Sequence, residues 1–136
     1  MGPDHLAAHA VKVSHHGSAN GYCEGLWQIF AARGKPLGVV TAYVSQSLPR
    51  RTALEEIGRH TDRLLTTCIT ALKEEQLPTA LDPSIFKSRL ALLRKMGVLT
   101  DTGRHQCGRC TLVFDKSGNC VETLLVSPAG ELPAVS

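Results

Sequence analysis

The chain has 136 residues, a formal net charge of +3 and 20% charged residues, so it is long enough for one domain with its own core and does not have a disordered composition. Its hydrophobic content of 43% is typical of a globular protein. No apolar run approaches the roughly 20 residues that cross a bilayer, so no membrane partner is expected. Basic residues are scattered and aromatic residues are few, so charge alone does not support nucleic-acid binding.

The start of the chain and its cysteines both indicate a cytoplasmic protein. Residues 1–5 lack the basic stretch and apolar core of a signal peptide. The cysteines are odd in number and irregularly spaced, which does not suggest a disulfide framework.

The first half of the chain alternates short apolar runs with helical segments, which is typical of an α/β layer architecture. A short helix end is expected at 6–9. Strands and helices are then expected in the order strand 10–14, helix 22–33, strand 36–43, helix 50–60 and strand 63–68.

The expected helix at 22–33 should bury one stripe of side chains at helical spacing. That stripe consists of Tyr22, Leu26, Ile29, Phe30 and Arg33. Asn20 is the expected N-cap and Gly34 the expected stop. Trp27 is expected in the core rather than as a platform for a ligand.

The second half changes character. A helix at 82–97 begins with Asp82 as N-cap and Pro83 in its first position, and Gly97 should end it. Phe86, Leu90, Leu93 and Gly97 should lie on one face of this helix, and Ile85, Arg89, Leu92 and Met96 on the neighbouring face.

A β-hairpin should follow this helix. Its strands are expected at 110–114 and 121–126 around a turn that contains Gly118, and 128–136 should be a frayed end. The chain thus reads as a single domain over 1–136, with a strand-helix core at 1–68 and a helix and hairpin at 69–136.

The sharpest motif lies where the first strand ends, because residues 12–18 read Lys-Val-Ser-His-His-Gly-Ser. Adjacent side chains on a strand point to opposite faces, so His15 and His16 require a bend or have different roles. Gly17 permits the bend and lets backbone approach a ligand. Imidazole is a common zinc ligand, and the carboxyl edge of an α/β sheet is where such proteins place their sites.

This segment resembles the Lys-Val-x-His-His-Gly-Ser segment of metallo-β-lactamase-superfamily hydrolases, in the group related to bacterial competence (DNA-uptake) proteins. The similarity covers most of the chain, and the His-His-Gly-Ser segment is its specific part. Further similarities occur in order at Leu26-Trp27, 40–43, Leu48-Pro49, Thr61-Asp62, Thr66-Thr67 and Pro128-Ala129. The resemblance implies an α/β fold, namely the C-terminal half of a metallo-β-lactamase αβ/βα sandwich with a terminal helix and β-hairpin.

The resemblance also implies roles for the motif. His16 would be a metal ligand and His15 the catalytic residue on the substrate side, although which of the two binds metal stays open. Gly17 and Ser18 would belong to the substrate loop. The implied chemistry is hydrolysis, with a phosphoester the expected type of substrate, assisted by zinc or manganese ions that lower the pKa of a bound water.

The sequence lacks the other metal-binding residues of the superfamily. The His-x-His-x-Asp-His motif, the later single histidine and the bridging Asp are absent. A catalytic zinc usually has three protein ligands, and this chain offers one or two. We therefore expect a fragment, a split gene product or a degenerate relative that is inactive and metal-free alone. Its expected partner is a missing N-terminal half, a second copy or another protein that covers an apolar sheet face.

Two other groups of metal-binding residues are weaker. His5 and His9 would share one helix face, but two solvent-facing histidines near a terminus are the preferred explanation. Cys107 and Cys110 form one Cys-x-x-Cys pair, which His105 and Cys120 could nominally complete. The expected hairpin holds Cys110 and Cys120 roughly 17 Å apart, too far for a shared zinc. The remaining alternative to a hydrolase module is a non-catalytic remnant or protein-interaction module.

Overall fold

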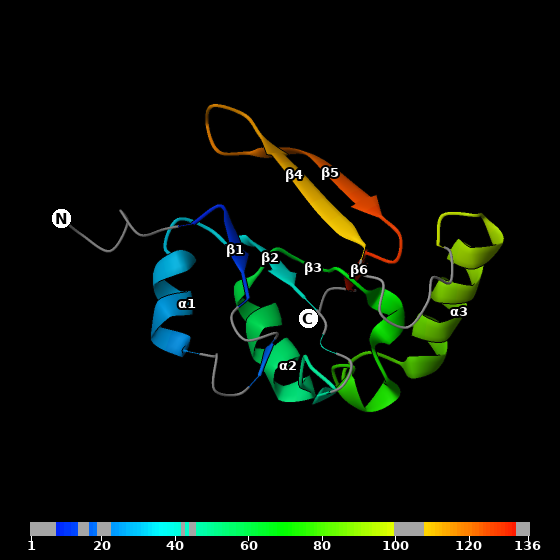
Figure 1. Cartoon of the computed structure of the whole chain (residues 1–136). Coiled ribbons are helices and arrows are strands. Elements are labelled where there is room, and N and C mark those ends of the chain that lie inside the picture. Colours follow the sequence, from blue (N-terminus) through cyan, green and yellow to red (C-terminus); the bar gives the residue numbers. More distant parts are fainter. Residues whose placement is uncertain are drawn as a thin grey trace.

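The structure, a computed structural model, describes residues 8–13, 17–18, 23–41, 43, 46–99 and 108–132. Within these residues the fold is mixed α/β, with three α-helices, a four-stranded sheet and a separate two-stranded sheet (Figure 1). The α/β class expected from the sequence is therefore confirmed. The expected Asn20 cap, His5 and Cys107 lie outside the described residues.

The central sheet has the strand order β1-β2-β3-β6. The first three strands run parallel, and β6 is antiparallel to β3. The strands span Ala10–Lys12 (β1), Leu37–Val40 (β2), Arg63–Thr66 (β3) and Gly130–Leu132 (β6). Parallel neighbours need crossover connections, which here are the helices α1 (Glu24–Phe30) and α2 (Arg51–His60). Figure 1 shows both helices on the same side of the sheet.

The main core lies between α2 and the sheet. Leu54 and Ile57 on α2 are almost fully buried and belong to the same cluster as Val40 and Leu64 on the strands. The strands β2 and β3 are near-continuous apolar runs, as expected for parallel strands covered on both faces.

Helix α1 is shorter than expected and is rotated relative to the predicted stripe. Leu26, which was expected inside, is 49% exposed, whereas Trp27 is 5% exposed. The Trp27 ring contacts Phe30 edge-on and stacks on His60 of α2. The large indole therefore determines which face of this two-turn helix is buried. The prediction that Trp27 belongs to the core is confirmed.

The hairpin formed by β4 (Arg109–Phe114) and β5 (Cys120–Val126) covers the sheet face opposite the two crossover helices (Figure 1). Three contacts hold it there. The Gly108 N–H donates to the Thr67 carbonyl at 2.7 Å, Arg63 Nη1 donates to Thr123 Oγ1 at 3.0 Å, and the Cys110 thiol lies 3.8 Å from the Thr66 carbonyl oxygen. The predicted hairpin is thus confirmed, with each strand starting one residue earlier than expected.

A frayed end was expected at 128–136, and this prediction is wrong for residues 128–132, which the structure describes. Strand β6 extends the central sheet, with Leu132 opposite Leu64 and Gly130 opposite Thr66. Pro128, Ala129 and Leu132 are buried. A three-residue strand gives no period to detect in a sequence, which is why the pattern did not reveal it.

Helix α3 (Pro83–Lys95) stands beside β6 at one end of the molecule (Figure 1). Asp82 caps it as predicted, because its carboxylate accepts a 2.8 Å hydrogen bond from the Ser84 N–H. Phe86 and Leu90 are buried, so of the two neighbouring faces predicted for this helix the one with Phe86 and Leu90 meets the core. Gly97 follows the helix in the left-handed region, with φ of +73°.

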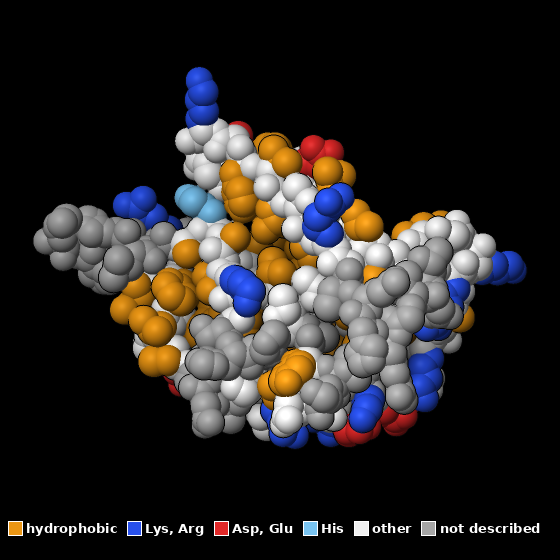
Figure 2. Space-filling model, in the orientation of Figure 1, with side chains coloured by type: hydrophobic (Ala, Val, Ile, Leu, Met, Phe, Trp, Pro, Cys, Tyr) orange, Lys and Arg blue, Asp and Glu red, His pale blue; other side chains and the backbone are white. Residues whose placement is uncertain are grey.

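We expected an exposed apolar face on the sheet, but the exposed apolar side chains lie on other elements. Large apolar side chains of the described part of the central sheet are buried or half-buried. The exposed ones gather on the outer elements, at Val113, Phe114, Val121, Leu124, Leu125 and Val126 of the hairpin and at Ile85 and Leu92 of α3. Figure 2 shows apolar side chains on and beneath the hairpin. The hairpin lies over the sheet and itself carries exposed apolar side chains.

Candidate functional site

The carboxyl ends of β1, β2 and β3 meet at one edge of the central sheet, because the three strands are parallel and adjacent. Val13 follows β1 at this edge, and Gly17 lies near Val40 at the end of β2, since a Cβ on Gly17 would lie 3.5 Å from the Val40 side chain. His15 and His16 themselves lie outside the described residues, as does Ser14. Gly17 and Ser18 are described, and they fix where the chain passes after the two histidines.

Gly17 packs tightly against the start of α2. Its φ is +75°, a conformation that side chains other than glycine rarely adopt, and a Cβ at this position would lie 2.5 Å from Pro49 Cβ. Its carbonyl accepts a 3.1 Å hydrogen bond from the Arg50 N–H. The glycine of the motif is therefore required by close backbone approach, and it holds the loop against the edge of the sheet. Ser18 is half-buried beside it.

Two threonines follow β2 and β3 at this same edge. Thr41 follows β2, and Thr67 follows β3 with its N–H donating to the Val40 carbonyl at 3.2 Å. The Oγ1 atom of Thr67 is buried and has no hydrogen-bond partner among the described residues. A buried hydroxyl without a partner costs about 1–3 kcal/mol, so this is the one described polar side-chain atom at the edge whose bonding is incomplete.

The described residues do not by themselves form a metal site. Among them, no three His, Cys, Asp or Glu side chains are grouped closely enough to hold an ion. The motif could add His15 and His16, so the residues of this edge fall short of the usual three protein ligands of a catalytic zinc. Zinc or manganese would need further ligands from elsewhere.

The described cysteines have the environment of ordinary small side chains rather than of reactive thiols. Cys68 is buried, and burial raises the pKa of the Cys110 thiol, which disfavours a reactive thiolate there. Cys110 pairs with Leu125 across the hairpin, whereas Cys120 pairs with Phe114 near the opposite end. This register agrees with the predicted separation of Cys110 and Cys120. Cys23 is exposed.

His9 is exposed, as expected for a histidine that faces solvent, whereas the short helix end expected at 6–9 is not present in its described part. Residues 8 and 9 are not helical, so His9 does not continue a helix face from His5. Its ring lies instead near the Phe114 ring of the hairpin, with the centroids 6.4 Å apart.

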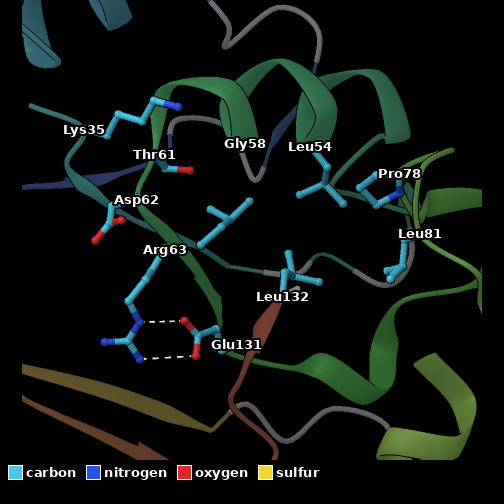
Figure 3. Close-up of a pocket in the computed structure, with 11 residues that line it drawn as sticks. Lys35, Leu54, Gly58, Thr61, Asp62, Arg63, Pro78, Leu81, Glu131 and Leu132 are labelled. Carbon is cyan, nitrogen blue, oxygen red and sulfur yellow. Dashed lines mark hydrogen bonds and ion pairs between the residues drawn. The ribbon is translucent and has the colours of Figure 1, made fainter. Parts of the chain in front are cut away.

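A cavity of about 200 Å³ lies at the opposite, amino-terminal edge of the sheet, which the sequence did not indicate (Figure 3). Leu54, Pro78, Leu81 and Leu132 form an apolar wall. Charged side chains line the other side, at Lys35, Asp62, Arg63 and Glu131.

The charges around this cavity are largely balanced. Arg63 Nε donates to Glu131 at 2.6 Å and Nη2 donates to its second oxygen at 3.3 Å, and this pairing raises the pKa of Arg63. Because Glu131 lies on β6 and Arg63 on β3, the pair also ties the last strand to the sheet. Lys35 and Asp62 add one charge of each sign. The cavity therefore has no net charge that would select an anion or a cation.

No described helix is both long and apolar enough to cross a bilayer. Comparisons of the chain with models of protein families, with curated proteins and with solved structures found no match.

Proposed function

We propose that this chain is one part of a metal-dependent hydrolase of the metallo-β-lactamase type, with a phosphoester as the class of substrate. In this proposal His16 is one metal ligand, His15 faces the substrate, and Gly17 and Ser18 form the loop that presents them. The other ligands come from a second polypeptide segment. The chain alone is inactive.

One observation carries the proposal, namely that the strand before the motif, β1, is a parallel strand whose carboxyl end lies at one edge of the sheet, and that Gly17 of the motif packs near the end of the neighbouring strand β2. This edge is where open α/β sheets place their ligands. Gly17 supports the assignment, because its packing against Pro49 leaves no room for a side chain and holds the loop at that edge. The buried hydroxyl of Thr67 at the same edge is a further group whose hydrogen bonding a bound ligand could complete.

The incompleteness is part of the proposal. Because no metal-binding group occurs among the described residues, the hydrolase needs ligands that His15 and His16 alone cannot supply. Fold class does not compensate for missing ligands, since function depends on the site rather than on the architecture.

The test is hydrolysis of bis(p-nitrophenyl) phosphate by the chain purified with the partners it has in its own cells, with zinc or manganese present. We expect His16→Ala to lower the rate by more than the roughly 10–100-fold that loss of a residue supporting a metal ligand costs, because it removes the ligand itself. His15→Ala should lower kcat more than it raises KM. His9→Gln is the matched control, because His9 is exposed and lies outside the motif. Equal rates in the native and His16→Ala assemblies would refute the hydrolase assignment.

A second candidate is a non-catalytic protein-interaction module. The observation that favours it is the apolar outer face of α3, where Ile85 and Met96 are 64% and 65% exposed. Contiguous exposed apolar surface on a small domain marks a site of protein association. Absence of any metal-dependent hydrolysis, together with a stable complex, would favour this candidate.

A further inference from the structure

Helix α3 exposes apolar side chains that the fold leaves unpaired. Ile85, Leu92 and Met96 lie at helical spacing along its outer face and are 64%, 56% and 65% exposed. This is the face next to the buried one formed by Phe86 and Leu90. A helix with one apolar face in the core has no structural need for a second, so this outer stripe points to a partner.

The charge of α3 restricts the chemistry of that partner. The helix sequence contains Lys87, Arg89, Arg94 and Lys95 and no acidic residue. At helical spacing, Arg89 flanks the apolar stripe on one side and Lys95 on the other. Lys87 pairs with Glu74 at 3.3 Å on a different side of the helix. The stripe therefore has cations along both borders, and Figure 2 shows Lys and Arg side chains at this end of the molecule.

A groove beside the stripe gives the surface its shape. Its volume is about 210 Å³, and it runs between α3 and the end of β5, with Leu93 and Val98 on one side and Leu125 on the other. Arg89 lines the groove and also borders the stripe. Glu131 also lines the groove, but its carboxylate is paired with Arg63, so Arg89 is the charge left to select a partner. The groove has room for a bulky apolar side chain that carries a carboxylate nearby.

We propose that α3 and this groove bind an acidic amphipathic helix of a partner protein. Its apolar side chains pack on Ile85, Leu92 and Met96, one bulky side chain fills the groove, and Asp or Glu residues pair with Arg89 and Lys95. This is the helix-in-groove mode of recognition. The proposal does not depend on the hydrolase assignment, because neither α3 nor the groove includes a residue of the His-His-Gly-Ser motif.

The observations disfavour two other occupants. A second copy docked through α3 would bring two basic helices together, and like charges across an interface are repulsive. An anionic bilayer would satisfy the charge, but a flat surface leaves the groove unfilled. The apolar stripe is also narrow compared with the broad apolar face of helices that lie in a membrane surface.

The test selects peptides from a random display library against the folded chain, followed by titration of the selected peptide with native and variant proteins. We expect the selected sequences to be acidic, with bulky apolar residues at helical spacing. Arg89→Glu and Leu92→Gln should each weaken the affinity roughly tenfold, as loss of central contacts does. The matched controls are Lys116→Glu, the same charge change in the exposed hairpin turn, and Val121→Gln on the outer hairpin.

Charge exchange makes the test specific. Replacing with lysine the one acidic residue of the selected peptide that pairs with Arg89 should restore binding to Arg89→Glu and weaken binding to the native chain. Raising the salt concentration should weaken the native complex, because exposed charges are screened. The proposal is overturned if selection yields no acidic peptides, if the controls weaken binding as much as the α3 variants, or if the chain instead binds phosphatidylglycerol vesicles or self-associates through Leu92.

Discussion

The central sheet and the outer elements of this protein use apolar residues in opposite ways. In β2 and β3 the apolar side chains are inside, and Val40 and Leu65 are completely buried. In the hairpin and α3 many are outside, including Leu124 at 47% and Met96 at 65% exposure. Since burial of apolar area is the main stabilising term in folding, the sheet accounts for most of the stability. The outer elements are therefore where binding surfaces are available.

The largest expected difference is between equivalent truncations in the two regions. Leu65→Ala in β3 should lower the free energy of unfolding by about 2–5 kcal/mol, because a completely buried leucine leaves a cavity. Leu124→Ala on the hairpin should cost less than about 1 kcal/mol, since much of that side chain already contacts water. Urea denaturation of the two variants measures both values. Equal losses would contradict the division into a stabilising sheet and an outer surface.

The next effect concerns the edge that carries the proposed site. Gly17→Ala should lower the free energy of unfolding by roughly 1–3 kcal/mol, because it combines a strained φ with a contact to Pro49. Gly25→Ala in α1 is the matched control, because a Cβ there meets nothing within 4 Å. That control should raise stability by about 0.5–1 kcal/mol. Equal changes in the free energy of unfolding for the two variants would contradict the tight packing of Gly17 against Pro49.

A smaller effect is expected where β6 joins the sheet. Glu131→Gln removes the charge that pairs with Arg63. The Glu131 side chain is 33% exposed and the Arg63 side chain 38%. Solvent screens such a pair, so the loss should stay below about 1 kcal/mol. Amide exchange should quicken in β6 and in the hairpin, which Arg63 also contacts through Thr123. Glu56→Gln, which breaks a surface pair with Arg59, should leave exchange in β6 unchanged.

The smallest effect is a dependence on pH. The Thr79 N–H and hydroxyl both donate to Glu55, which lowers the pKa of its carboxyl. A carboxyl whose pKa is lowered by folding contributes stability above its unfolded pKa, about 4.3, and loses it as pH falls through the folded pKa. Thermal melts should therefore show Glu55→Gln less stable than the native chain at pH 7. That difference should shrink towards pH 3, and one that grows on acidification would contradict the assigned hydrogen bonds.

The sequence predicted the elements with strong local signals. Asp82 and Pro83 marked the start of α3, and the turn with Gly118 marked the hairpin, because capping and turn chemistry act over a few residues. Apolar runs located β2 and β3, because a strand covered on both faces is apolar at nearly every position. These features require no knowledge of the tertiary structure.

The sequence did not predict features that depend on contacts between distant segments. The buried face of α1 follows from Trp27 meeting His60, and β6 exists because Leu132 pairs beside Leu64. The cavity between Lys35 and Leu132 has the same origin, as it joins segments from opposite ends of the chain. For the proposed site, sequence reasoning located the motif after β1. His15 and His16 lie outside the described residues, so their roles stay predictions.

The most direct test of the hydrolase proposal is the metal content of the chain purified with its cellular partners. We predict bound zinc or manganese that falls to background in His16→Ala and is unchanged in His9→Gln. A preparation that keeps its metal after His16→Ala, or that contains none in the native assembly, would contradict the proposal that this chain contributes a ligand to a metal-dependent hydrolase.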